Sequence, residues 1–315
     1  MAPRYGPPDA SLAPRYTGVR TFARLPHVTE PEGVDAAVVG VPFDTATSFR
    51  PGARFGPEGI RAASLLLRPW HPVLAVDVFA SQSLVDWGDL AVTPGNAERT
   101  AEQIHAGLRP LVAAGITPLV LGGDHSIVLG ELRAHAERHG PLGLVLLDAH
   151  ADTWDRYYGE RYFHGTPFRR AVEEGLLAPE RSTLAGMRGP LYAPSDLDEP
   201  RGWGLEIIPG EDLRALSPIE YGRRVRERGG DGPLYLSFDI DVIDPGFAPA
   251  TGTPEVAGLE PHAALGFLRA LAGLEFVGFD VVEVAPAYDG PGQQTALLAA
   301  AIAYELLALR ALAGR

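Results

Sequence analysis

Three short segments rich in aspartate and histidine each follow an apolar run in this chain of 315 residues. The segments occupy residues 122–126 (GGDHS), 148–152 (DAHAD) and 237–241 (SFDID). The preceding runs, at 118–121, 142–147 and 234–238, are largely apolar, which is typical of strands covered on both faces. Because ligands collect at the carboxyl ends of parallel strands, we expect the three segments to converge in one cleft.

The rest of the chain alternates short apolar runs with longer helical patterns. Further strands are expected at 36–41, 84–87, 182–185, 205–208 and 276–282, with a less clear stretch at 73–79. Helices are expected at 57–67, 97–114, 127–138, 167–174, 218–228, 261–272 and 293–313. Strand followed by helix, repeated, predicts an α/β fold with a mostly parallel sheet between helices. Residues 1–33, rich in Pro, Gly and Arg, are expected to form an irregular arm, and 34–315 a single domain.

The bulk composition excludes several classes of partner. A formal net charge of −13 argues against nucleic acid, whose phosphates attract basic surfaces. The absence of cysteine excludes disulfides and thiolate metal ligands. The N-terminus lacks the apolar core of a signal peptide, and Tyr304, Glu305 and Arg310 interrupt the most apolar run. We therefore expect a cytoplasmic protein with no membrane partner.

The spacing within the acidic segments suits divalent metal ions. Asp148, His150 and Asp152 alternate, as do Asp239 and Asp241, so an extended backbone would point each set to one side. An oxygen-rich set with a minority of imidazole favours Mn²⁺ over zinc. Asp148 and Asp239 each begin their ligand set at a strand end, which makes them natural bridges between two ions. Two such ions make hydroxide available near neutral pH, which predicts a metallohydrolase.

Several further stretches complete a family resemblance. The chain resembles the ureohydrolases, which comprise arginases, agmatinases and related guanidino-acid hydrolases. The residues that carry the resemblance are 40–44 (GVPFD), 51–57 (PGARFGP), the three acidic segments, 164–170 (HGTPFRR) and 280–284 (DVVEV). The resemblance covers almost the whole chain and implies a three-layer α/β/α sandwich around a sheet of about eight strands.

The same resemblance implies roles for the candidate site residues. One manganese ion would be held by His125, Asp148, Asp152 and Asp239, and the other by His150, Asp241 and the bridging Asp148 and Asp239. Asp152 would also orient the attacking hydroxide and accept its proton. Glu283 would grip the substrate guanidinium through paired charged hydrogen bonds. His164 would carry a proton toward the leaving amine, which must be protonated to depart.

The loop after the second segment bears on which guanidine is cleaved. Trp154 and Glu160 stand where arginases carry Asn and Ser that fix the amino-acid end of arginine, which counts against arginine. Asp155 and Glu160 could face the ammonium of agmatine, whereas Arg156 or Arg161 could face the carboxylate of 4-guanidinobutyrate or another guanidino acid. We favour agmatine, cleaved to putrescine and urea.

Two other classes of protein are possible from the metal ligands alone, a phosphoesterase and an inactive binding paralogue. A two-metal phosphoesterase would use similar ligands, but its anionic substrate calls for a cation where Glu283 stands. An inactive binding paralogue would have lost a ligand or His164, and neither is lost. His135 and His139 share a face of one expected helix, which we expect to be solvated. The family commonly assembles as trimers or hexamers, so a homo-oligomer is expected.

Overall fold

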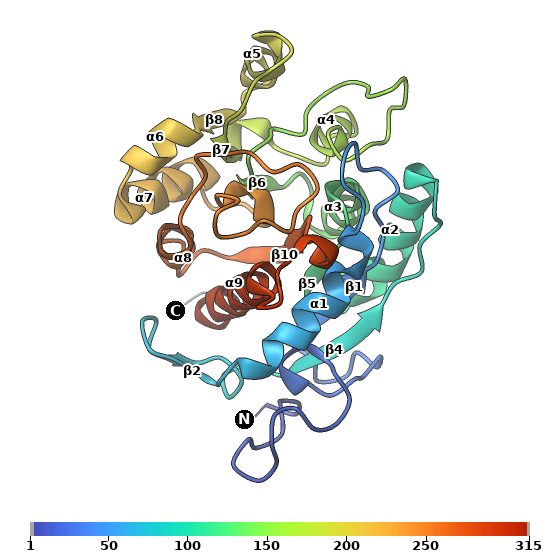
Figure 1. Cartoon of the computed structure of the whole chain (residues 1–315), viewed down its shortest axis with the longest axis vertical. Helices are drawn as coiled ribbons and strands as arrows, with labels where there is room; N and C mark the ends of the chain where they lie inside the picture. The colour runs from blue at the N-terminus through green and yellow to red at the C-terminus, as the bar shows by residue number, and fades with distance from the viewer. Residues whose placement is uncertain (1–2, 314–315) are drawn as a thin grey trace.

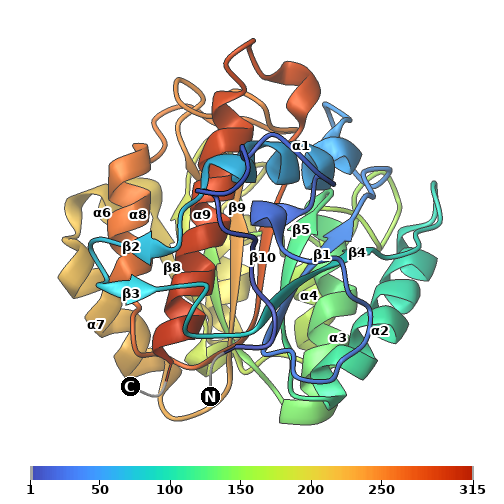
Figure 2. The same cartoon turned by 90° about the horizontal axis from the view of Figure 1, so that it is seen from below.

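The structure is a computed structural model that describes residues 3–313, and Figures 1 and 2 show its three layers. Within these residues, eight parallel strands form the central sheet in the order β4-β1-β5-β10-β9-β6-β7-β8. In that order the strands are Leu84–Asp89, Ala36–Val41, Thr117–Gly122, Phe276–Val282, Leu234–Asp239, Gly143–Leu147, Thr183–Met187 and Glu206–Pro209. The predicted α/β/α sandwich with a parallel sheet of about eight strands is confirmed.

Helices cover both faces of the sheet, and this explains why its central strands are apolar throughout. One face packs against α1 (Gly56–Ala63), α7 (Pro218–Gly229), α8 (Pro261–Arg269) and α9 (Gln294–Leu312). The other packs against α2 (Ala97–Ala113), α3 (Val128–His139) and α4 (Pro167–Glu173). Figure 2 shows α8 and α9 on one side of the sheet and α2 and α3 on the other. Strands β1, β6 and β9 are buried at every residue, as parallel strands covered on both faces should be.

Some local expectations differ from the structure. The expected helix at 57–67 ends at Ala63 and continues as the 3₁₀ turn Ser64–Leu66. The stretch 73–79 contributes β3 (Val76–Asp77), which pairs antiparallel with β2 (Trp70–His71). Helices α5 (Ser195–Gly202) and α6 (Gly210–Ala215) were not expected, because neither has enough apolar residues at helical spacing to predict a helix.

The expectation that His135 faces solvent is wrong. His135 is fully buried on α3, and its ring lies 5.2 Å from that of Tyr235. Its Nδ1 contacts the carbonyl oxygen of Glu131 at 2.8 Å. Burial lowers the pKa of His135 to about 4, so the ring is neutral and packs as a core residue.

Helix α9 is long and apolar enough to cross a membrane by length and composition alone. However, 67% of its most apolar window is buried inside the protein. Ile302, Leu306 and Leu309 belong to the same buried cluster as residues of α8 and the sheet. Packing in the core therefore explains the apolar composition of α9.

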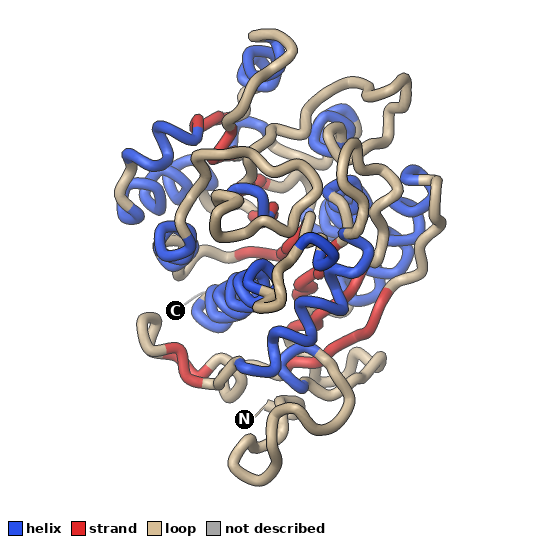
Figure 3. Tube along the Cα trace, viewed as in Figure 1, coloured by secondary structure: helices blue, strands red, loops and turns tan. Residues whose placement is uncertain are grey.

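The N-terminal segment 3–33 is irregular apart from the 3₁₀ turn Phe22–Arg24, as Figure 3 shows. Phe22 is buried, and its N–H donates to Asp86 Oδ2 at 2.7 Å. The same carboxylate receives two hydrogen bonds from Arg61, at 2.8 and 2.9 Å. This segment is thus anchored to β4 and α1. The division into an arm (1–33) and one domain (34–315) stays a prediction, and residues 1–2 and 314–315 lie outside the described residues.

The turn that leaves β5 depends on Gly123. A Cβ atom there would lie 2.1 Å from the carbonyl oxygen of Phe43 and 2.7 Å from that of Val41. Those carbonyls accept hydrogen bonds from the N–H groups of Asp124 (2.8 Å) and Gly123 (3.2 Å). Only glycine allows this close approach of two backbone segments, which fixes the start of the 124–126 turn.

We predict that Gly123→Ala destabilises the protein by about 2–3 kcal/mol, because the added methyl group must displace backbone. Urea unfolding followed by circular dichroism measures the change. Gly202→Ala is the matched control, since a Cβ there meets nothing within 4 Å. Equal unfolding midpoints for the two variants would contradict this account of the turn.

Candidate metal centre and adjoining cavity

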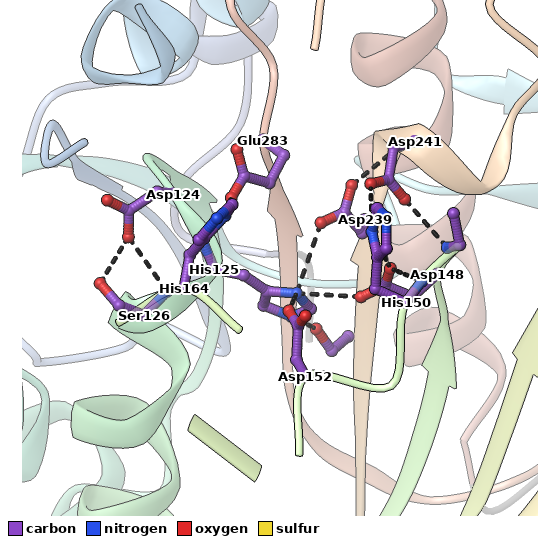
Figure 4. A network of polar contacts seen from close by, with 12 residues as sticks. Asp124, His125, Ser126, Asp148, His150, Asp152, His164, Asp239, Asp241 and Glu283 are labelled. Atoms are coloured by element: carbon purple, nitrogen blue, oxygen red, sulfur yellow. Dashed lines mark hydrogen bonds and ion pairs between the residues drawn. The ribbon is translucent and has the colours of Figure 1, made fainter. Parts of the chain in front are cut away.

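Four neighbouring strands deliver the candidate residues to one edge of the sheet, as Figure 4 shows. His125 follows β5, Glu283 follows β10, Asp239 ends β9 and Asp148 follows β6. These strands are adjacent in the order β5-β10-β9-β6, so residues far apart in the sequence meet. Parallel strands place all their carboxyl ends at one edge, which is the usual ligand site of such sheets.

The imidazole of His125 faces three carboxylates. Its Nδ1 lies 3.1 Å from Asp148 Oδ2, 2.9 Å from Asp152 Oδ2 and 3.4 Å from Asp239 Oδ2. His125 and Asp148 are fully buried. The atoms that would ligate an ion therefore already point at a common centre.

A second cluster shares Asp148 with the first. His150 Nδ1 lies 2.9 Å from Asp241 Oδ2 and 3.6 Å from Asp148 Oδ1. The side chain of His150 is 29% exposed, so this cluster lies nearer the solvent. Since Asp148 directs one oxygen to each cluster, it is the natural link between them.

Backbone hydrogen bonds hold these carboxylates in place. Asp148 Oδ1 accepts from His150 N at 2.6 Å, and Asp239 Oδ1 accepts from Asp241 N at 2.8 Å. In both cases one oxygen closes a local turn while Oδ2 stays directed at His125. Asp152 also adopts a left-handed backbone conformation, with φ of 50°, which is uncommon outside glycine and typical of functional sites.

A buried chain of hydrogen bonds orients His125 from behind. Its Nε2 lies 2.8 Å from Ser237 Oγ, which donates to Asp280 Oδ1 at 2.7 Å. Because the Ser237 hydroxyl gives its hydrogen to Asp280, Nε2 carries the ring hydrogen and donates to Oγ. Once Nδ1 has lost its proton, this arrangement directs its lone pair toward the carboxylates, as support around metal-binding histidines usually does.

The electrostatics of the clusters favour a cation. Burial lowers the pKa of His125, but ionic contacts with Asp148, Asp152 and Asp239 outweigh it and leave the pKa well above its usual value. The pKa of His150 is likewise raised well above normal, because Asp241 and Asp148 outweigh burial. Burial, followed by the charges of the neighbouring aspartates, raises the pKa of Asp239 well above its usual value. Before an ion binds, the clusters therefore hold protons that a cation would displace.

The donor set fits divalent metal ions. Two groups have their ligand atoms within 4.8 Å of one another, His125–Asp148–Asp239 and Asp148–His150–Asp241. His125 Nδ1, Asp148 Oδ2 and Asp241 Oδ2 are buried and make no well-formed hydrogen bond within residues 3–313. Buried polar atoms without partners are rare, and an ion bound at their common centre would satisfy them.

A cavity of about 390 Å³ opens beside the clusters. His150, Asp152, Asp239, His164 and Glu283 line its inner part together with Ser48. Its wall also includes Trp154, Arg188, Tyr192, Asp196 and Glu255. A small molecule in this cavity would lie against both clusters.

His164 and Glu283 form a pair at the cavity wall. His164 Nδ1 lies 2.9 Å from Glu283 Oε1, which also accepts from His125 N at 3.0 Å. Burial lowers the pKa of His164, but the hydrogen bond and charge of Glu283 outweigh it and raise the pKa above normal. Glu283 has φ of 62°, a second uncommon backbone conformation among the site residues.

Asp124 supports the site without belonging to either cluster. It accepts hydrogen bonds from Ser126 N at 3.0 Å and Ala46 N at 2.9 Å. Burial, followed by the charge of Glu283, raises the pKa of Asp124 to about 7.

The structure does not bring all the expected tail-binding residues to the cavity. The expected residues are Trp154, Asp155 and Glu160. Among them, only Trp154 lines the cavity within the described chain. Asp155 instead pairs with Arg170 at 2.8 Å, and the exposed Glu160 closes a turn with Tyr157. The predicted roles of Asp155 and Glu160 in binding a substrate tail stay predictions, and their positions outside the cavity do not support them.

Several cavity residues escaped the sequence analysis, among them Ser48 and Glu255. Ser48 lies between two of the stretches that carry the family resemblance, which was an available signal. Glu255 follows no recognisable pattern, and only the folded chain shows that it faces the cavity.

Comparisons with known proteins agree with this geometry. The arginase family profile matches residues 34–309. Mitochondrial agmatinase of Gallus gallus is 48% identical over 301 residues, which span 96% of this chain and 88% of that protein. Mitochondrial guanidino acid hydrolase of Homo sapiens is 45% identical, covering 97% and 87%. The solved structure of proclavaminate amidino hydrolase from Streptomyces clavuligerus has a TM-score of 0.91 at 43% identity, covering 96% and 100%.

The clusters at the ends of parallel strands, together with a family match over nearly the whole chain, define a hydrolase of arginase-like α/β/α fold whose site could hold metal. The chain belongs to the arginase family and hydrolyses small guanidino compounds. The resemblance inferred from the sequence is thereby confirmed.

We predict that divalent cations bind more tightly as pH rises through the neutral range. The raised pKa values of His125 and His150 mean that both rings are protonated at lower pH and must lose that proton to ligate. Calorimetric titration with Mn²⁺ in two buffers of different ionisation enthalpy measures the protons released. Equal heats in both buffers, together with an affinity independent of pH, would contradict the prediction.

Proposed function

We propose that this guanidino hydrolase holds two Mn²⁺ ions and cleaves agmatine to putrescine and urea. His125, Asp148, Asp152 and Asp239 would hold one ion, and His150, Asp241 and the shared Asp148 and Asp239 the other. The two groups of converging donors and their unsatisfied buried atoms support this assignment. When bound, such ions would lower the pKa of water and so make a hydroxide nucleophile available near neutral pH.

The chain's own side chains would bind and protonate the substrate. Glu283 Oε2 is buried and has no hydrogen-bond partner within the described residues, so it is free to accept from a guanidinium N–H. Asp152, beside His125, would orient the nucleophile and accept its proton. His164 is held by Glu283 and would supply the proton that the leaving nitrogen needs.

The charge along the cavity wall supports a substrate with a cationic tail, and this observation carries the choice of agmatine. Asp196 and Glu255 add carboxylates to the wall, and the half-buried Glu255 forms no side-chain ion pair within residues 3–313. Arg188 is a cation on this wall, but its guanidinium nitrogens donate to backbone carbonyls such as those of Asp241 (2.6 Å) and Val256 (3.0 Å). An ammonium group would therefore be better matched than a carboxylate.

A guanidino acid is the second candidate. It is favoured by the similarity to proteins named guanidino acid hydrolase and guanidinobutyrase. Neither Arg156 nor Arg161, the cations expected to face a carboxylate tail, lines the cavity within the described chain. Arg161 instead pairs with Glu173 at 3.0 Å.

We predict that the purified enzyme with Mn²⁺ releases urea faster from agmatine than from 4-guanidinobutyrate or arginine. Glu255→Gln should raise KM for agmatine about tenfold at nearly unchanged kcat, since one charged hydrogen bond is lost. Steady-state kinetics on the three substrates measures both effects. The exposed Glu275→Gln serves as the control, and a preference for 4-guanidinobutyrate would refute the choice of agmatine.

We also predict that Asp148→Ala removes both ions and abolishes urea release. Asp241→Asn should mainly weaken the ion at His150, because Asp241 contributes to one group only. Metal analysis by mass spectrometry after gel filtration counts the ions per chain. Two ions retained by Asp148→Ala would overturn the assignment.

We propose a homo-oligomer, a trimer or hexamer, that works in the cytoplasm. Light scattering coupled to gel filtration tests the assembly. Two observations argue against a two-metal phosphoesterase. The acidic Glu283 lines the cavity, and the chain is similar to guanidino hydrolases.

A further inference from the structure

Both ring nitrogens of His164 are engaged in the structure. Nδ1 faces the carboxylate of Glu283 at 2.9 Å and carries a hydrogen, because a carboxylate oxygen accepts. Nε2 lies 2.8 Å from Ser48 Oγ, and the backbone N–H of Ser48 also points at it from 3.0 Å. His164 therefore has no nitrogen left that reaches a molecule in the cavity directly.

Ser48 is held in this position by the backbone around it. The N–H of Ala46 donates to Asp124 Oδ2 at 2.9 Å, and the carbonyl of Ala46 accepts from the N–H of His164 at 3.0 Å. The segment before Ser48 is thus tied to the same strand-end loops that carry the site. The side chain of Ser48 is half-buried and lines the cavity with Glu283 and His150. Ser48 and His164 both line this cavity, and the Ser48 hydroxyl is the side-chain group that contacts His164 Nε2.

We infer that Ser48 relays the proton from His164 to the leaving nitrogen of the substrate. The inference rests on the proposed function, since it needs a guanidine in the cavity. In neutral His164, Nε2 accepts from Ser48. When Nε2 is protonated, its N–H donates to Oγ, which frees the hydroxyl hydrogen to point into the cavity, and the backbone N–H of Ser48 no longer has Nε2 as its acceptor.

The transfer balances without another reactant. As the bond between carbon and the leaving nitrogen breaks, its electron pair stays on nitrogen, which takes the hydrogen of Ser48 Oγ. Oγ takes the proton from His164 Nε2 in the same step and is again a hydroxyl. His164 is left neutral, with its Nδ1–H still on Glu283. Because Asp152 has accepted the proton of the attacking hydroxide, the carbon–oxygen bond closes to a carbonyl, and urea and a neutral amine are the products.

The test compares Ser48→Ala with Ser48→Thr, which keeps a hydroxyl. Ser48→Ala should lower kcat for agmatine by about 100-fold, the lower end of what general acid catalysis contributes, and leave KM within about twofold. Ser48→Thr should recover most of the loss. Thr45→Ala is the matched control, because the Thr45 hydroxyl lies on the same segment but accepts from Gly95 N. It should keep the wild-type kcat.

A proton inventory measures how kcat depends on deuterium content in mixtures of H₂O and D₂O. A purely structural role of Ser48 would not change the shape of this dependence. The wild-type enzyme should show a curved dependence of kcat on deuterium content, as expected for two protons moving together, and Ser48→Ala a linear one. A linear dependence in the wild type overturns the relay even if Ser48→Ala fails to fold. So does a Ser48→Ala variant with undiminished kcat, or a folded Ser48→Thr variant as slow as alanine. If the wild type releases urea from no guanidine, the proposed function fails, and the relay falls with it.

Discussion

The mutual repulsion of buried carboxylates is the constraint on which the rest of the site depends. Asp148, Asp239 and Asp241 are almost fully buried within a few ångströms of two imidazoles. Burying several like charges is costly unless cations or protons compensate them. The raised pKa values of His125 and Asp239 express that cost as retained protons. A pair of divalent ions would remove it, and the fold is arranged to place the ligands accordingly.

The central sheet holds the two clusters and Glu283 in fixed positions. Strand β10 lies between β5 and β9, so its Asp280 can support Ser237 and, through it, His125. Glu283 directly follows the same strand, and its carboxylate contacts both His164 and the backbone of His125. The proposed ligands of an ion and the groups that would hold a guanidinium are therefore connected through one strand. A shift of β10 would disturb both functions together.

The sequence analysis succeeded where chemistry followed strand ends. The runs before 122–126, 148–152 and 237–241 are apolar enough to read as strands, and parallel strands bring their ends together whatever the details of packing. It failed where side-chain direction depends on tertiary contacts. His135 was expected in water but packs on Tyr235, and Asp155 turns toward Arg170 rather than the cavity. Glu255 and Ser48 reach the cavity from loops whose path no periodicity encodes.

The division between reaction and specificity follows from this geometry. In the proposed function the clusters and Glu283 would act on any guanidinium, whereas Glu255 and Asp196 on the cavity wall would meet the variable tail. The central claim is that the two clusters bind two ions linked by Asp148. Anomalous diffraction at the manganese edge from crystals grown with Mn²⁺ tests it most directly. Two peaks, one at His125 and one at His150, with Asp148 between them are the predicted result. A single peak elsewhere, or none, would contradict the account.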